Sequence, residues 1–269
     1  MKRLVGWTML FLLLVVWLIP IAWLVITSLK IERDVVTEHF TVFSSLPTAA
    51  NYIKAFGKTE ISRWLLNSVI VSAATTILSV LLCSTIAYAL ARIRFPGRNA
   101  IFIFVLAGMM VPFEAIIIQL YLEFNALGLI NTLTAMIVPR LAAPVGVFIL
   151  TQFFQGIPSE LEEAAFMDGA SRFIIFQSVI VPMGKAAIVA VMILSFINAW
   201  NDFLWPLVVA SQSVRYTITV GIANFQGTHG TEYSLIMAGS VIASVPQILA
   251  FLLFRDHIVK GIATTGIRG

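Results

Sequence analysis

Long runs without a charged residue constrain this chain more than any other feature of its sequence. A helix needs about 20 mostly apolar residues to cross the hydrocarbon core of a bilayer, where its backbone must satisfy its own hydrogen bonds. Three runs of this length carry no charge, at residues 4–29, 64–91 and 233–254. Three more carry a single charge each, at residues 99–122, 132–154 and 186–209. The sequence therefore predicts an all-α, polytopic membrane protein, with six transmembrane helices in a single domain over residues 1–269.

The composition agrees with that class. Hydrophobic residues make up 59% of the chain, charged residues only 11%, and the mean hydropathy is +0.98, beyond what soluble domains show. The net charge of +4 would suit a nucleic-acid partner. However, the basic residues cluster beside apolar runs, as membrane orientation signals do, so we expect no nucleic-acid binding. The one cysteine, Cys83, lies inside an apolar run and the three histidines are scattered, so we expect neither a disulfide framework nor a metal site.

The first run follows Met-Lys-Arg, so a secretory signal peptide has to be weighed against a transmembrane helix. The run is too long for a signal peptide and no small-residue cleavage site follows it, which favours the transmembrane helix. With six spans, both termini lie on one side of the membrane. That side also holds the larger share of the lysines and arginines near the membrane ends, which predicts that the N and C termini are cytoplasmic.

Residues 158–182 form the longest polar-rich interruption in the second half of the chain. Ser159 and Glu162 have the spacing of a capping box, which favours a helix start. Gly169 can end that helix in a left-handed conformation. Ser171 can cap a second short helix, and Pro182 is expected to end it. The segment therefore predicts a helix-turn-helix between two membrane spans, and its small residues leave a surface that another protein could approach closely.

This segment carries a family resemblance. The motif Glu163-Ala164-Ala165, followed by Asp168-Gly169-Ala170 and Ile180-Val181-Pro182, resembles the EAA loop of permease subunits of bacterial ABC importers. In that family the loop docks into a cleft on a cytoplasmic ATPase. The alternative is an ordinary surface helix that contains Glu-Ala-Ala by chance, and the composite spacing favours the EAA loop. Relatives usually carry a second proline soon after the first, where this chain has Met183-Gly184-Lys185-Ala186.

The resemblance implies roles for individual residues of the loop. Glu163 would hold the loop against backbone or basic groups of the ATPase, and Gly169 would permit the turn. The residues expected to form the ATPase-docking loop are Glu163, Ala164, Ala165, Asp168, Gly169 and Pro182.

Further motifs are similar to the carbohydrate-uptake branch of these importers, and within it to the maltose-type second permease. They lie at residues 51–52, 67–68, 87–97, 200–207, 260–261 and 266–269. The resemblance implies an ABC type I importer permease fold in the bacterial inner membrane and a sugar or oligosaccharide substrate. Its implied partners are a second permease subunit in a heterodimer, a cytoplasmic ATPase dimer and an extracytoplasmic substrate-binding protein. The implied C-terminal tail toward the ATPase contains Lys260, Gly261, Gly266 and Arg268.

The energy source is expected to lie outside this chain. The sequence contains no Walker-type loop, in which a glycine and Gly-Lys-Ser or Gly-Lys-Thr are separated by four residues. We find no nucleophile–base arrangement or carboxylate pair that would support an enzyme, so we predict a transport subunit without catalytic residues. We expect no cofactor on this chain, with ATP and Mg bound by the partner ATPase.

Three charges lie within predicted spans: Glu114, Arg140 and Asp202. A charge at the centre of a membrane helix costs about 2.5–3.5 kcal/mol on insertion scales, so each is expected to be paired or to face water. Arg140 follows Pro139 and precedes Pro144, and interrupted helices often flank substrate sites in transporters. We therefore predict that Arg140 pairs with Glu114 or Asp202 along the translocation pathway.

Polar and aromatic residues near the end of the fifth run have the chemistry of a sugar site. Asn198 and Asn201 could bond hydroxyl groups, and Trp200 and Trp205 could stack on a sugar ring. Interfacial anchoring is the commoner role of tryptophan in membrane proteins, and it is the expectation here. The candidate pathway residues are Glu114, Arg140, Asn198, Asn201 and Asp202.

Alternative functions remain open from the sequence. A glycerol-phosphate or polyol importer belongs to the same branch, and Arg140 would then be a candidate phosphate ligand because Arg matches phosphate geometry. An integral membrane enzyme would need a polar catalytic cluster at one membrane face, and a stand-alone secondary transporter would need an internal repeat. The sequence shows neither feature.

Overall fold

The computed structural model describes residues 2–37, 41–44, 46–226 and 231–265. In this part of the chain the regular structure is helical and no strand occurs. The helices of the first half are α1 (Lys2–Ser28), α2 (Glu32–Val35), α3 (Ala50–Lys58), α4 (Ile61–Arg92), α5 (Arg98–Gly108), α6 (Phe113–Ala126), α7 (Leu133–Ile137) and η1 (Val138–Leu141). The helices of the second half are α8 (Pro144–Gln155), α9 (Glu160–Met167), α10 (Arg172–Ile175), η2 (Phe176–Ile180), α11 (Val181–Met183), α12 (Lys185–Trp200), α13 (Leu204–Val209), η3 (Ser213–Arg215), α14 (Ile218–Ala223), η4 (Asn224–Gln226) and α15 (Tyr233–Thr265).

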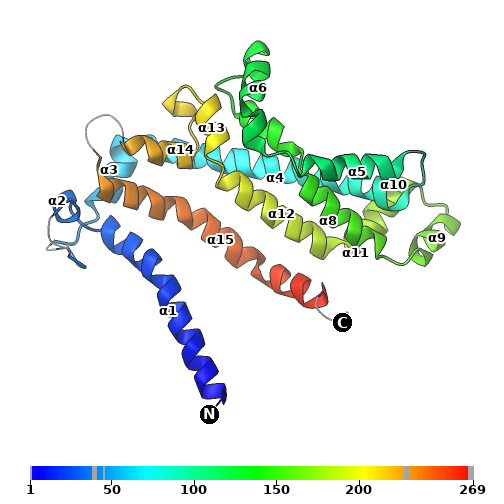
Figure 1. Cartoon of the computed structure of the whole chain (residues 1–269), viewed down its shortest axis with the longest axis horizontal. Helices are drawn as coiled ribbons and strands as arrows, with labels where there is room; N and C mark the ends of the chain where they lie inside the picture. Colours follow the sequence, from blue (N-terminus) through cyan, green and yellow to red (C-terminus); the bar gives the residue numbers. More distant parts are fainter. Residues whose placement is uncertain (1, 38–40, 45, 227–230, 266–269) are drawn as a thin grey trace.

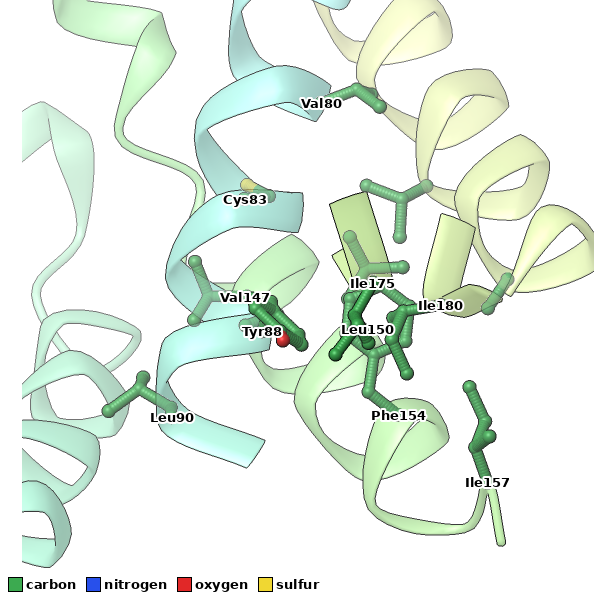
Figure 2. Packing of buried hydrophobic residues seen from close by; sticks show 13 residues of the cluster. Val80, Cys83, Tyr88, Leu90, Val147, Leu150, Phe154, Ile157, Ile175 and Ile180 are labelled. Carbon is green, nitrogen blue, oxygen red and sulfur yellow. The ribbon is translucent and has the colours of Figure 1, made fainter. Parts of the chain in front are cut away.

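Helix α4 lies at the centre of the bundle, where it packs along α8 and α12 and also contacts α5 and α14 (Figure 1). Close packing depends on small residues. A Cβ atom on Gly146 of α8 would lie 3.0 Å from the Cys83 sulfur of α4 and 3.0 Å from Val191 of α12. Figure 2 shows the core beside this contact, where Tyr88 of α4 meets Leu150 of α8 and residues that follow α9. The cysteine is thus a packing residue of the core.

Helix α1 leaves the bundle at an angle and packs mainly against α15 (Figure 1). Residues 6–28 form an apolar stretch, and its most apolar 18-residue window contains no buried residue. An apolar helix with no buried face requires lipid or another protein to cover it. The isolated position of α1 therefore agrees with a membrane protein.

The three charge-free runs form long helices, but the other three runs are broken. Helices α1, α4 and α15 are each long and apolar enough to cross a membrane, and the number of candidate spans rises to six if each bent helix pair is one span. Helices α5 and α6 meet at 96°, the α7–η1 segment meets α8 at 42°, and the α10–α11 segment meets α12 at 80°. Each of the runs 99–122, 132–154 and 186–209 is therefore divided between shorter helices, and the interruption expected near Arg140 is confirmed.

Prolines and polar residues explain these breaks. Pro112 has an extended backbone, with φ −65° and ψ 134°, and lacks the N–H that would continue α5. Pro144 begins α8 after a short extended stretch. In the fifth run, α12 ends at Trp200 and the short α13 starts at Leu204 after three non-helical residues. The breaks place charged side chains at helix ends rather than within helices.

Candidate functional site

Helix α9 protrudes at one end of the bundle, beyond the ends of α4 and α8 (Figure 1). Gly169 follows it with φ +80°, a left-handed conformation that residues with a Cβ adopt only with strain. Ser171 then caps α10, its side chain accepting a hydrogen bond from the Ile174 amide at 3.4 Å. The segment is therefore the helix-turn-helix that its sequence predicts.

The predicted capping box at the start of α9 is wrong. The Ser159 backbone is already helical and its side chain makes no cap hydrogen bond, whereas its carbonyl accepts from the amides of Glu162 and Glu163 at 3.0 Å. The Glu162 side chain turns inward to Arg92 at the end of α4, with Oε1 and Nε 2.9 Å apart. Both side chains are about one-tenth exposed, so this is a buried ion pair. The Glu162 carboxylate, which a capping box would need, therefore pairs with the buried Arg92 instead.

The end of α4 contacts the α9 loop on both sides of α9. The Arg92 guanidinium also donates a hydrogen bond, through Nη2, to the carbonyl of buried Ile157, just before α9. One turn earlier on α4, the Tyr88 hydroxyl donates to the Arg172 carbonyl at 3.3 Å, just after α9. The Tyr88 ring packs against Phe176, with centroids 5.1 Å apart. From the sequence, Arg92 was counted as an orientation charge and as part of the motif at residues 87–97, but its contact with the α9 loop was missed.

The outward surface of α9 mixes acidic and apolar side chains. Met167 is 89% exposed, and Leu161 and Phe166 are exposed beside it. Among the predicted docking residues, Ala165 is half-buried and the others are exposed: Glu163, Ala164, Asp168, Gly169 and Pro182. Exposed large apolar side chains grouped on one helix are typical of a protein-binding surface.

Pro182 does not end the second helix, contrary to the prediction. A π-helical turn, η2, leads into α11, and the Val181 amide bonds the Phe176 carbonyl five residues back. This wider turn accommodates the missing N–H of Pro182. The helix ends at Gly184, where an added Cβ would lie 2.5 Å from Cε1 of Phe154. Gly184 therefore permits the close contact of this segment with α8.

A second charged cluster lies toward the opposite end of the bundle from α9. Arg140 of η1 binds the Asp202 carboxylate through two N–H groups on one edge of its guanidinium, with Nε at 2.7 Å from one carboxylate oxygen and Nη2 at 2.9 Å from the other. The Asp202 side chain is 9% exposed and that of Arg140 is 30% exposed. The guanidinium carbon lies 3.7 Å from the ring centroid of Phe113, and Thr219 donates to the Asp202 carbonyl. The pair joins η1 to the segment between α12 and α13, beside the start of α6.

This geometry decides between the two predicted partners of Arg140. Asp202 is the partner, and Glu114 is exposed on α6 and forms no ion pair with any residue that the structure describes. The position of these residues along a translocation pathway stays a prediction.

The predicted sugar-site residues divide into two groups. Trp200 and Trp205 are buried, and their indole N–H groups donate to the carbonyls of Ala243 at 3.2 Å and Ala135 at 2.8 Å. Both therefore pack between helices, and the expected interfacial anchoring is wrong for them, as is a stacking platform. Asn198 and Asn201 are exposed, and the Asn201 side-chain amide donates a hydrogen bond to the Ile197 carbonyl at 2.8 Å.

An apolar groove of about 1090 Å³ lies between α4, α8, α12 and α15, with Ala190, Phe148 and Phe251 among its lining residues.

Within the described ranges, no group of three or more His, Cys, Asp or Glu side chains is placed to hold a metal ion. In the predicted tail, Lys260 and Gly261 lie on the backbone of α15, and Gly266 and Arg268 lie outside the described residues.

Comparisons with known proteins place these features in context. A family model described as "Binding-protein-dependent transport system inner membrane component" matches residues 79–264. An arabinooligosaccharides transport system permease protein of Bacillus subtilis is 35% identical over 266 residues, covering 97% of this chain and 95% of that relative. A trehalose/maltose transport system permease protein of Thermococcus litoralis is 33% identical over 263 residues, covering 96% and 94%.

One solved structure has the same fold. It is the crystal structure of a bacterial ABC transporter involved in the import of the acidic polysaccharide alginate. The matched chain superposes with a TM-score of 0.82 at 20% identity, with 94% of this chain and 95% of that chain covered. The bent helix pairs therefore belong to a known membrane architecture.

Proposed function

Since the chain belongs to the family of binding-protein-dependent transport system inner membrane components, we propose that it is the permease subunit of an ATP-driven importer for a sugar or oligosaccharide. The observation that carries the proposal is the α9 loop. Its Glu-Ala-Ala motif forms a helix at the tip of the bundle and presents acidic and apolar side chains outward. A separate ATPase is the partner that this surface fits.

The substrate class follows from the relatives and from the state of Arg140. The relatives are described as permeases for arabinooligosaccharides, trehalose and maltose, which favours a sugar over a polyol. A glycerol-phosphate importer would need a free cation for the phosphate. Arg140 already binds Asp202 with two hydrogen bonds, so its charge is neutralised. We therefore favour a sugar or oligosaccharide.

The proposed mechanism is alternating access driven from outside this chain. The ATPase dimer, with its ATP and Mg, grips α9 in the cytoplasm, and a second permease subunit and an extracytoplasmic binding protein complete the importer. Closure of the ATPase moves α9, and the flanking helices α8 and α12 rock as rigid bodies to alternate access to a central site. In this orientation α9 lies on the cytoplasmic side of the bacterial inner membrane. The last turns of α15 run toward the same end of the molecule, which supports a tail directed at the ATPase (Figure 1).

Co-purification from native membranes in mild detergent tests the proposal. We expect an ATPase and a second permease to accompany the tagged wild-type chain, and the ATPase to be lost with Glu163→Lys. The matched control is Glu123→Lys, the same change at an exposed position on α6, away from α9. A chain that purifies alone, or a Glu163→Lys variant that keeps its ATPase and transport, would show that α9 is only a surface helix.

Uptake by vesicles that contain the purified complex tests the substrate class. We expect labelled oligosaccharides to be taken up in an ATP-dependent manner, with the co-purified binding protein added outside. Uptake of glycerol phosphate in preference to sugars would support the alternative importer.

A further inference from the structure

Helix α9 is held by a helix to which it is not joined in the chain. Its covalent neighbours are α8 before it and α10 after it, so movement of α9 reaches those helices through the backbone. Helix α4 ends at Arg92, and the chain then leads to α5, which begins at Arg98. Nevertheless, the end of α4 forms the buried ion pair with Glu162 and holds the chain on either side of α9. These side chains therefore give a direct route for coupling between α9 and α4, beside the packing of α4 on α8 and α12.

We infer that Arg92 is a positioning residue that ties the proposed docking helix α9 to α4, so that movement of the ATPase is delivered directly to the central helix of the bundle. The inference rests on the proposed function and adds a route for the movement. Since α4 packs along both α8 and α12, displacement of its end shifts the helices on both sides of it.

Two adjacent acidic residues on α9, Glu162 and Glu163, lie on different faces of the helix and have different roles. Glu163 is exposed on the outer surface that we propose for the ATPase. Glu162 is 8% exposed and faces the bundle, where its carboxylate meets Arg92. Among the described residues, Glu162 is the only carboxylate that forms an ion pair with Arg92. The outer face of α9 can therefore engage a partner while the inner face stays bound to α4.

Breaking the buried Arg92–Glu162 ion pair is energetically costly. Removing one member of a buried ion pair leaves the other charge without compensation, which is far more costly than losing a surface pair. Arg92 is also the last residue of α4, where its positive charge interacts favourably with the negative end of the helix dipole. The hydrogen bond from its guanidinium to the Ile157 carbonyl adds a contact with the chain just before α9. Thus α9 and the end of α4 move as one unit.

A merely structural role predicts a different outcome from a positioning role. If the pair only kept α9 folded, its loss would weaken binding of the ATPase, and ATP hydrolysis and transport would fall together. If the pair delivers movement to α4, the ATPase still binds the outer face of α9 and hydrolyses ATP, while less transport results from each ATP. The ratio of sugar transported to ATP hydrolysed distinguishes the two.

The experiment uses the complete complex in vesicles, with both permeases, the ATPase and the binding protein. The variants are Arg92→Gln and Glu162→Gln, which remove one charge, and the exchange variant Arg92→Glu with Glu162→Arg. The matched control is Arg94→Gln, the same change at an exposed residue two positions away. Retention of the ATPase is measured by co-purification for every variant.

We expect Arg92→Gln and Glu162→Gln to keep the ATPase and to lower the ratio of transport to hydrolysis by about fivefold or more, as loss of an inter-site coupling does. The exchange variant should recover part of the ratio, since it restores the ion pair but not the hydrogen bond to the Ile157 carbonyl. Arg94→Gln should leave the ratio unchanged. An unchanged ratio in Arg92→Gln, or joint loss of the ATPase and of transport without recovery in the exchange variant, would overturn the inference. Absence of sugar uptake by the wild-type complex would refute the proposed function and this inference with it.

Discussion

The Arg140–Asp202 pair offers a direct test of how strongly the bent spans are held together. Three variants form a double-mutant cycle: Arg140→Gln, Asp202→Asn and the two combined. Each change keeps the approximate shape of the side chain and removes one charge. The pair joins η1 to the segment between α12 and α13, so its loss loosens two breaks that no continuous helix stabilises.

The two single variants should differ because the partners differ in exposure. Arg140→Gln leaves the Asp202 carboxylate only 9% exposed and without its cation, so we expect a loss of about 3 kcal/mol in the free energy of unfolding, at the low end for broken buried pairs. In Asp202→Asn the guanidinium keeps 30% exposure and its contact with Phe113, so we expect a loss of about 1.5 kcal/mol, as for a hydrogen bond to a charged group. In the double variant no unpaired charge remains, so its loss should fall short of the sum by about 2 kcal/mol.

The free energy of unfolding can be measured by denaturing titration of the full chain in mixed micelles, followed by the fluorescence of its six tryptophans. Glu114→Gln is the matched control, since Glu114 is an exposed acid in a predicted span and should change stability by less than about 0.5 kcal/mol. Sugar uptake by the complex should fall with Arg140→Gln. Additive losses in the cycle, or unchanged stability and transport in Arg140→Gln, would refute the reasoning.

Three further predictions concern close packing and a buried hydrogen bond. Gly221→Ala should destabilise the chain by about 3 kcal/mol, because the added Cβ would lie 2.1 Å from the nearest atom of the Trp64 ring. Gly184→Ala should cost about 2 kcal/mol, because the Cβ would lie 2.5 Å from Cε1 of Phe154 on α8. Trp205→Phe should cost about 2 kcal/mol, because it leaves a buried carbonyl of α7 without its donor. The same titration measures all three.

Matched controls exist for these changes. Gly57→Ala adds a Cβ that meets nothing within 4 Å, and it should raise helix stability by up to about 1 kcal/mol. Trp7→Phe alters a tryptophan that is 72% exposed on α1 and should be nearly neutral. Glycine variants that behave like Gly57→Ala would contradict the packing argument, and equal effects at the two tryptophans would contradict the role of the buried hydrogen bond.

The membrane class and the α9 loop could be predicted from the sequence because both depend on local properties. An uncharged run of sufficient length becomes a helix in any apolar surrounding, as α1 and α4 show. The turn after α9 requires a left-handed residue, and Gly169 provides it locally. Such features need no knowledge of distant contacts.

The bends could not be predicted from proline alone. Pro20 and Pro246 lie inside the continuous helices α1 and α15, whereas Pro112 separates two helices at 96°. The difference is tertiary packing: beyond Pro112, Phe113 and Phe124 of α6 both contact the buried Trp205 ring edge-on. That packing orients α6 away from α5, and the hydropathy of the run contains no information about it.

Ion pairs between residues far apart in the chain were the second feature that the sequence could not determine. The rule that a charge within a span needs a partner correctly identified Arg140 as paired, but spacing alone left two acids as candidates. Arg92 lies just beyond a span, where lysines and arginines are common, so nothing in the sequence marked it as bound to Glu162. Only the contact between distant segments separates a positioning arginine from an orientation charge.

Helix α4 is fixed by polar side chains at both of its ends, which has a mechanical consequence. Opposite Arg92, Asn67 donates two hydrogen bonds of 2.9 Å to backbone carbonyls of the segment before α14, and Ser68 accepts one from the Ile218 amide at 2.8 Å. A helix of 32 residues is about 48 Å long, enough to reach from one membrane face to the other. Because an unbroken helix transmits displacement along its axis, α4 connects the α9 loop to the opposite end of the bundle. In the proposed rocking motion, α4 is the element against which the helices packed on it would move.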